Sequence, residues 1–296
     1  MVNDDAIQRS VQYLQGGDLD RAEETVRQLL REEPQHVQGW CLLGSLRQAR
    51  GKPEEAFTLF KEAARLDPQS AEPYNLIGGT YLQIRQPERA IAYLEEALRL
   101  RPFFPEAYNN LAKAYLLQKR DVEALNCFRE AVHLRPDFVE ALNNLALVHI
   151  ARREFDEARP LLERVMQVAP AFAVALVSLS LIHFEKGELD SALALAQRAL
   201  QLNPRLPAVQ DQVGVVLLKM GRGEEAIAHF RAALQVAPDY CQAVEHLGLA
   251  LATLHRLEEA VACLERAAQL DPTNTRIQSN LASARIQQGR KQTKGL

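Results

Sequence analysis

The chain has 296 residues, of which 47% are hydrophobic and 25% are charged, and its formal net charge is −3. It carries no excess of positive charge for binding nucleic acid or anionic lipid, so we expect neither as a partner. Its apolar runs are too short to insert into a membrane, and the start, MVNDDAIQRS, lacks the apolar stretch of a signal peptide.

Prolines recur along the chain every 34 residues without a slip in register. They stand at Pro34, Pro68, Pro102, Pro136, Pro170, Pro204, Pro238 and Pro272. Each follows apolar residues at helical spacing, and proline ends a helix because it lacks an N–H and disfavours helical angles in the preceding residue. We therefore predict eight helix pairs, over residues 3–36, 37–70, 71–104, 105–138, 139–172, 173–206, 207–240 and 241–274.

The fourth unit shows how each pair is built. One apolar series includes Leu111 and Tyr115, a second includes Ala124 and Phe128, and the polar linker 118–121 parts them. When the recurrent proline is counted as position 32, position 20 is alanine in all eight units, and position 8 is always glycine, alanine or serine. Because larger side chains would hold the axes apart, these positions predict where the two helices cross.

The end of the chain departs from the pattern. Residues 275–289 form a ninth first helix with many polar residues, which indicates a solvating C-terminal cap. Glycine suits the left-handed end of a helix, and Gly289 stands at the same position as Gly17, Gly51, Gly187 and Gly221. We therefore expect the helix to end there and the basic residues 290–296 to form a disordered tail.

The pattern resembles a tetratricopeptide repeat (TPR) array, whose period is 34 residues. The aromatic, Leu-Gly, Tyr signature of that family stands here as Trp40, Leu43 and Gly44, and as Tyr74, Ile77, Gly78 and Tyr81. The resemblance implies an all-α fold, a right-handed α-solenoid of eight 34-residue helix pairs plus a capping helix. It also implies a single domain over residues 1–289.

In TPR folds, positions 5, 6, 9, 12 and 13 of each first helix line the concave surface. Positions 5 and 6 of repeats three to five are rich in carboxamides: Asn75, Asn109, Asn110, Asn143 and Asn144. Asparagine is a poor residue inside a helix, roughly 0.6 kcal/mol worse than alanine, so its repetition calls for a reason. A carboxamide both donates and accepts hydrogen bonds, and could hold the main chain of an extended peptide.

This series is similar to the asparagine ladder in the TPR region of O-linked N-acetylglucosamine transferase. Only Asn110, Asn144 and Asn280 match its position 6, so the ladder is partial. The alternative is a polar face that is merely solvated.

Further candidates share these groove positions. Gln212 and His246 stand at position 6 and Lys113 at position 9. An apolar strip through Leu147 and Leu181, with Phe184 nearby, would receive apolar side chains of the peptide. The alternative for the strip is packing between neighbouring first helices.

The sequence holds no catalytic or cofactor motif, so we expect no enzyme, no cofactor and no metal. His149 and His183 replace the expected tyrosine at position 11 one repeat apart, but the pattern offers no third zinc ligand, so we interpret them as packed histidines. The four cysteines have no CxxC spacing and fit free thiols in a reducing compartment, which predicts a cytoplasmic protein.

These observations favour a non-catalytic scaffold or adaptor that binds an extended peptide segment of a partner protein in the concave groove. One alternative is a targeting or substrate-recruiting subunit for a glycosyltransferase- or sulfotransferase-like enzyme on another chain. Another is a self-assembling scaffold, a homo-oligomer formed through the terminal repeats.

Overall fold

A computed structural model describes residues 2–294, with side chains for residues 5–290. Within that range the regular structure is entirely helical. The helices are α1 (Val2–Gln15), α2 (Leu19–Glu32), α3 (Val37–Ala49), α4 (Pro53–Leu66), α5 (Ala71–Gln83), α6 (Pro87–Leu100), α7 (Pro105–Leu117), α8 (Asp121–Leu134), α9 (Val139–Ala151), α10 (Phe155–Val168), α11 (Ala173–Glu185), α12 (Leu189–Leu202), α13 (Pro207–Lys219), α14 (Gly223–Val236), α15 (Cys241–Thr253), α16 (Leu257–Leu270) and α17 (Thr275–Lys294).

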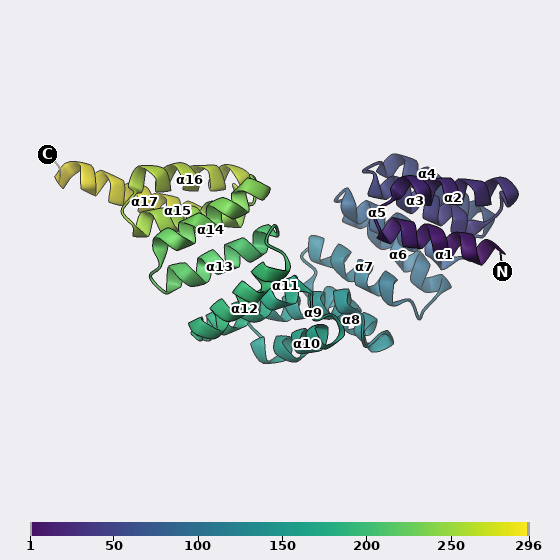
Figure 1. Ribbon diagram of the computed structural model, residues 1–296, viewed down its shortest axis with the longest axis horizontal. Helices are drawn as coiled ribbons and strands as arrows, with labels where there is room; N and C mark the ends of the chain where they lie inside the picture. Colours follow the sequence, from purple (N-terminus) through teal and green to yellow (C-terminus); the bar gives the residue numbers. More distant parts are fainter. Residues whose placement is uncertain (1, 295–296) are drawn as a thin grey trace. The chain divides into compact units, whose positions relative to one another are not determined.

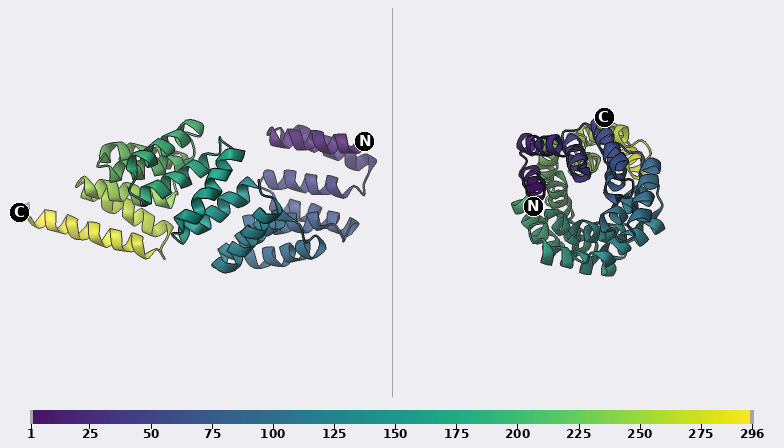
Figure 2. Two further views of the ribbon diagram at one scale, coloured as in Figure 1. Left: turned by 90° about the horizontal axis from the view of Figure 1, so that it is seen from below. Right: turned by 90° about the vertical axis from the view of Figure 1, so that its right-hand side faces the viewer.

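The chain divides into two compact units, Met1–Val148 and His149–Leu296, and the division falls inside α9. Within each unit, consecutive helices pack in pairs and the pairs stack on one another (Figures 1 and 2). Each first helix also contacts the first helix of the next pair, as α3 does with α5 and α13 with α15. The prediction of an all-α solenoid of helix pairs is therefore confirmed.

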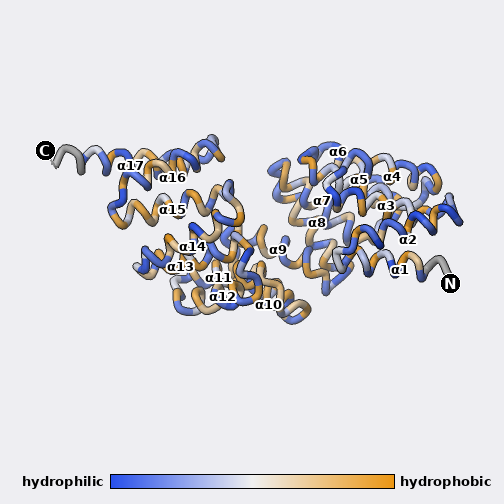
Figure 3. Tube along the Cα trace, turned by 45° about the horizontal axis from the view of Figure 1, so that its top comes forward, coloured by the Kyte–Doolittle hydropathy of each residue, from blue (hydrophilic) through white to orange (hydrophobic). Residues whose placement is uncertain are grey.

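Four of the pairs close around a glycine and a large residue. The glycine at position 8 of a first helix receives the large side chain at position 24 of its partner, as Gly44 does Phe60 and Gly214 does Phe230. Both phenylalanines are fully buried. Along the helices, hydrophobic stretches alternate with hydrophilic ones (Figure 3). The predicted crossing points are thus places where the two helices of a pair approach closely.

Two neighbouring glycines of α5 allow a matched test of this packing. A Cβ added at Gly78 would lie 2.5 Å from Leu94 Cγ, whereas at Gly79 the nearest atom, Asn110 Nδ2, would be 3.7 Å away. We expect Gly78→Ala to lower the free energy of unfolding by about 1–3 kcal/mol through overpacking. Gly79→Ala should leave it unchanged or raise it by up to about 1 kcal/mol, since alanine is the better helix former. Chemical denaturation measures both, and equal midpoints for the two variants would contradict this packing.

The turn between the helices of a pair places one residue in the left-handed region. Glycine fills this position at Gly17, Gly51, Gly187 and Gly221, with φ between 72° and 81°. In four other repeats the same position has φ between 55° and 61° without being glycine: Arg85, Lys119, Arg153 and His255. Because a side chain at positive φ is strained, these four repeats carry a conformational cost that the glycine repeats avoid.

The capping helix is longer than predicted. It begins at Thr275 as expected but continues to Lys294, past the expected end at residue 289. Gly289 is helical here and is not in the left-handed conformation of the other turn glycines. The prediction of a disordered tail is therefore wrong for residues 290–294, and residues 295–296 lie outside the described part.

Candidate binding surface on the first helices

Side chains on successive first helices are joined by hydrogen bonds between residues 35 apart. Asn110 Nδ2 donates to Asn75 Oδ1 over 2.9 Å, and Asn144 Nδ2 donates to Asn109 Oδ1 over 3.1 Å. In each case a position 6 side chain reaches back to the position 5 side chain of the preceding repeat. We call this row of pairs the inter-repeat ladder.

The two positions of the ladder differ in exposure. Asn75, Asn109 and Asn143 at position 5 are buried, with 6%, 2% and 6% of their surface exposed, whereas Asn110 and Asn144 are half-buried. All five carboxamides were expected to face the groove, but in the structure the three at position 5 are buried and only the two at position 6 are partly exposed. Position 5 is covered where first helices contact one another, and the position 6 carboxamides remain accessible to a ligand.

The second unit repeats this arrangement with other chemistry. His246 Nδ1 lies 2.8 Å from Asp211 Oδ1, and Asn280 Nδ2 donates to Glu245 Oε1 over 2.8 Å. Gln212 departs from the pattern, because the residue 35 positions earlier, Val177, is apolar. Its Nε2 donates instead to the buried Ser180 Oγ over 3.0 Å. Gln212 and His246, both predicted as groove residues, are thus also tied to the preceding repeat.

One member of the ladder lacks a partner. The buried oxygen Asn143 Oδ1 accepts no hydrogen bond in the described part of the chain. In the next repeat, position 6 is Ser178, whose hydroxyl donates to Val174 O of its own helix over 3.1 Å.

The other predicted groove residues have varied surroundings. The Lys113 ammonium pairs with Glu140, which removes it as a free cation. Leu147 is 41% exposed and is available to an apolar partner group. Leu181 and Phe184 are half-buried and belong to the second unit, so their place beside the carboxamides stays a prediction.

Acidic residues at position 2 of repeats three and four are paired along the same surface. Glu72 accepts from Arg101 over 3.0 Å, and Glu106 pairs with Arg135. Like the pair between Lys113 and Glu140, these are partly exposed, so each contributes only about 0–1 kcal/mol to stability. Their effect is to leave the surface around the carboxamides close to neutral.

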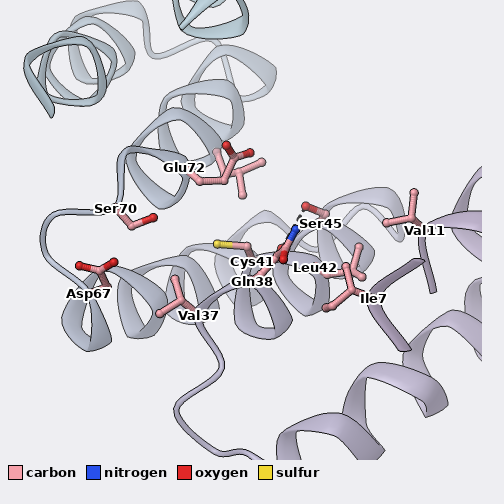
Figure 4. Close-up of a pocket in the computed structure, with 11 residues that line it drawn as sticks. Ile7, Val11, Val37, Gln38, Cys41, Leu42, Ser45, Asp67, Ser70 and Glu72 are labelled. Atoms are coloured by element: carbon pink, nitrogen blue, oxygen red, sulfur yellow. Dashed lines mark hydrogen bonds between the residues drawn. The ribbon is translucent and has the colours of Figure 1, made fainter. Parts of the chain in front are cut away.

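A pocket that the polar groove positions of the sequence did not indicate lies in repeats one to three (Figure 4). Its volume is about 410 Å³, and its apolar wall includes Ile7, Val11, Val37 and Leu42. Here position 5 of one repeat and position 6 of the next are both apolar, Ile7 with Leu42 and Cys41 with Leu76, and searching these positions for apolar as well as polar residues would have indicated the pocket. Cys41 lines it too, and burial, followed by the charge of Glu72, raises the pKa of the Cys41 thiol to about 12. Cys41 is therefore an uncharged part of the wall.

The two histidines are packed and hydrogen-bonded, as the sequence indicated. His149 Nδ1 lies 2.7 Å from Glu154 Oε2 and is buried, and His183 Nδ1 makes the equivalent contact with Glu188. No group of three or more metal-binding side chains occurs among the described residues. Residues 2–294 also contain no helix that is both long and apolar enough to cross a membrane.

Repeated helix pairs, joined in register by side chains on their first helices, define the chain as a helical-repeat solenoid. The sequence model of the tetratricopeptide repeat matches residues 10–71, 76–137, 123–165, 143–207 and 214–275, and a second model with the same description matches residues 48–102. The chain therefore belongs to the tetratricopeptide repeat family. Such arrays generally serve protein–protein interaction, and the chain is a scaffold of this kind.

Solved structures share the fold at low identity. One described as the APC/C hetero-tetramer Cut9-Hcn1 has 16% identity and a TM-score of 0.76, over 90% of this chain and 52% of that chain. This chain thus spans about half the length of that structure. PilF of Pseudomonas aeruginosa has 23% identity and a TM-score of 0.59, over 70% and 95% of the two chains.

A tetratricopeptide repeat protein from Parabacteroides merdae has 19% identity and a TM-score of 0.61, over 84% of this chain and 98% of that chain. No curated protein matches the sequence. At these identities the likeness extends to the fold alone.

Proposed function

We propose that this protein is a non-catalytic scaffold that holds an extended peptide segment of a partner along α5, α7 and α9. The observation that supports it is the state of Asn110 and Asn144. Each uses one N–H to bond the preceding repeat, while its oxygen and second N–H have no partner in the described part of the chain. These free groups match what a peptide main chain offers, one donor and one acceptor per residue.

The spacing of the ladder supports an extended ligand. Packed helices lie roughly 8–10 Å apart, and a strand rises about 3.3 Å per residue. Successive position 6 carboxamides would therefore meet the main chain about every third residue. Such contacts read the backbone more than the side chains, and Leu147 adds an apolar contact beside them.

We expect uncharged groups to make the contacts with the peptide. Because the acidic side chains at position 2 of repeats three to five already pair with basic ones, carboxamides rather than free charges would carry the contact. Binding should accordingly change little with salt concentration, since screening weakens charge pairs and leaves amide hydrogen bonds largely intact. A partner that moderate salt releases would indicate a different surface.

The test replaces the carboxamides without leaving buried groups unpaired. The chain itself offers an apolar version of the ladder, Cys41 and Leu76 at the same positions. The double variants Asn75→Cys/Asn110→Leu and Asn109→Cys/Asn144→Leu, combined in one protein, copy that version into repeats three to five. Asn126→Leu, on the second helix α8, makes the same chemical change on another helix as a control.

We expect the combined variant to bind roughly ten- to a hundredfold more weakly than the wild type. Each carboxamide bond contributes about 0.5–1.5 kcal/mol net, and about 1.4 kcal/mol is a factor of ten. Affinity purification with wild-type protein supplies the partner, and calorimetric titration compares the variants. Unchanged affinity in the combined variant, or equal loss in Asn126→Leu, would end the proposal for this surface.

The same purification separates the alternatives. Recovery of a glycosyltransferase- or sulfotransferase-like enzyme would favour a targeting subunit. Self-association through the terminal repeats would appear as a mass that rises with concentration in light scattering. At the N-terminal end, Ile7 is already buried against Leu42 and Leu43 of the same unit, so it is not available to a second copy.

A further inference from the structure

The pocket of about 410 Å³ in repeats one to three differs from the carboxamide surface in both shape and chemistry. It lies between α1, α3 and α5 and is bordered by the linker between α4 and α5. Its volume falls in the lower part of the range for small-ligand sites, about 300–1,000 Å³. It can therefore enclose one or two side chains and is too small for a helix.

The pocket exists because of the residues at three register positions. Position 5 of one repeat and position 6 of the next are both apolar here. One such pair, Ile7 and Leu42, belongs to a single hydrophobic cluster. Position 9 is Ser45 in α3, where repeats five, six and eight carry leucine, so this smaller side chain leaves volume unfilled. The Ser45 hydroxyl donates to Cys41 O over 3.0 Å and adds no free polar group to the wall.

Carboxylates stand at one end of the pocket, away from Ile7 and Val11 (Figure 4). Asp67, the C-terminal cap of α4, accepts the Gln69 N–H over 3.0 Å and forms no ion pair with any described residue. Glu72 has one cation, Arg101, at 3.0 Å. The two carboxylates at this end are therefore balanced by only one cation, which leaves one net negative charge.

Burial raises the pKa of the Glu72 carboxyl, Arg101 opposes that shift, and the charge of Glu106 adds to it. A second cation beside Glu72 would offset both the cost of burying the charged Glu72 carboxylate and its repulsion from Glu106. The pocket thus presents an apolar wall ending in a carboxylate that lacks a cation.

We propose that this pocket binds an aliphatic side chain of a partner peptide whose neighbouring residue is lysine or arginine. The aliphatic group lies against Val11, Val37 and Leu42, and the cation lies between Asp67 and Glu72. This site is separate from the carboxamides and does not require that they bind anything. It gives the scaffold a sequence preference that contacts to a peptide main chain cannot supply.

The test uses three synthetic peptides in one neutral frame, Gly-Ser-Gly-X-Z-Gly-Ser-Gly, with Leu-Lys, Leu-Glu or Ser-Lys at X-Z. Ligand-observed NMR with the full chain measures weak binding of each. We expect Leu-Lys to bind, Leu-Glu to bind at least about fivefold more weakly and Ser-Lys more than about tenfold more weakly. Equal binding of Leu-Lys and Leu-Glu, or no binding of Leu-Lys, would overturn the proposal.

Variants locate the binding site. Ser45→Leu fills the pocket from α3 and Val11→Phe fills it from α1, and each should weaken Leu-Lys binding more than about tenfold. Ser283→Leu makes the same change at position 9 of α17, where the serine has the equivalent bond to the carbonyl four residues earlier, and should leave binding intact. Retained binding in both filled variants would place the peptide elsewhere.

The charge variant Asp67→Asn removes the unpaired carboxylate, leaves Glu72 balanced by Arg101 and should bind Leu-Lys and Leu-Glu equally. A preference for Leu-Lys that survives in it would contradict the role of the carboxylates. The variants in repeats three to five that test the carboxamide surface leave Ser45, Asp67 and Glu72 untouched. Failure of one proposal is therefore distinguishable from failure of the other.

Discussion

Asn110→Leu should destabilise the contact between α5 and α7, whereas Asn75→Cys/Asn110→Leu should restore it. The single change leaves Asn75 Oδ1 buried without its donor, which costs about 1–3 kcal/mol. The second change removes that orphaned oxygen and copies the pairing of Cys41 with Leu76. We therefore expect a double-mutant cycle with a coupling energy above about 1 kcal/mol.

Repeat arrays can unfold in stages, so the readout should be local as well as global. Hydrogen exchange of amides in α5 and α7 reports the opening of this contact, and chemical denaturation reports the whole chain. The single variant should exchange faster in both helices, and the double variant should return towards the wild type. Additive effects of the two substitutions would show that the hydrogen bond does not couple the repeats.

The capping helix should depend on one buried carboxylate. Glu245 is 1% exposed, and both of its partners come from α17: Asn280 donates over 2.8 Å and Arg276 over 2.7 Å. Arg276→Ala/Asn280→Ala leaves this charge unpaired. We expect a loss of about 3 kcal/mol, the lower end for breaking a buried pair, because the Arg276 side chain is itself 65% exposed.

Proteolysis and hydrogen exchange of α17 measure this effect directly. Arg285→Ala removes another ion pair of α17, the one between Arg285 and Glu265 of α16. Both of these partners are exposed, so the change should alter stability by less than about 1 kcal/mol. Adding Glu245→Val to the double variant removes the stranded charge and should recover part of the loss. If Arg285→Ala loosens α17 as much as the double variant does, Glu245 is not the anchor.

The helix pairs could be predicted from sequence because their register depends on residues with strong steric requirements. The proline at position 32 follows the end of a second helix in each of the eight repeats, and Gly44 or Gly78 at a crossing makes room for Phe60 or Leu94. Gly289 shows the limit of such reasoning. It occupies the position of a helix end in the other repeats, yet α17 continues through it.

The candidate binding surface was less predictable, because periodicity identifies a helix face and leaves open what covers that face. Asn75 and Asn109 share the concave positions with Asn110, but the next first helix lies over them. Helix propensity alone suggests that Asn110→Ala is harmless, since alanine is the better helix former. The structure predicts the opposite, because the hydrogen bond to the preceding repeat is lost.

The ladder also determines which whole repeats the array can lose or copy. Deleting residues 105–138 would place Asn144 against Asn75, which is again a pair of carboxamides. Deleting residues 71–104 would place Asn110 against Cys41 and leave an amide facing a thiol. The middle of the array can therefore lengthen or shorten by one repeat while its neighbours stay matched, whereas the junction between the apolar and amide stretches resists such a change during evolution.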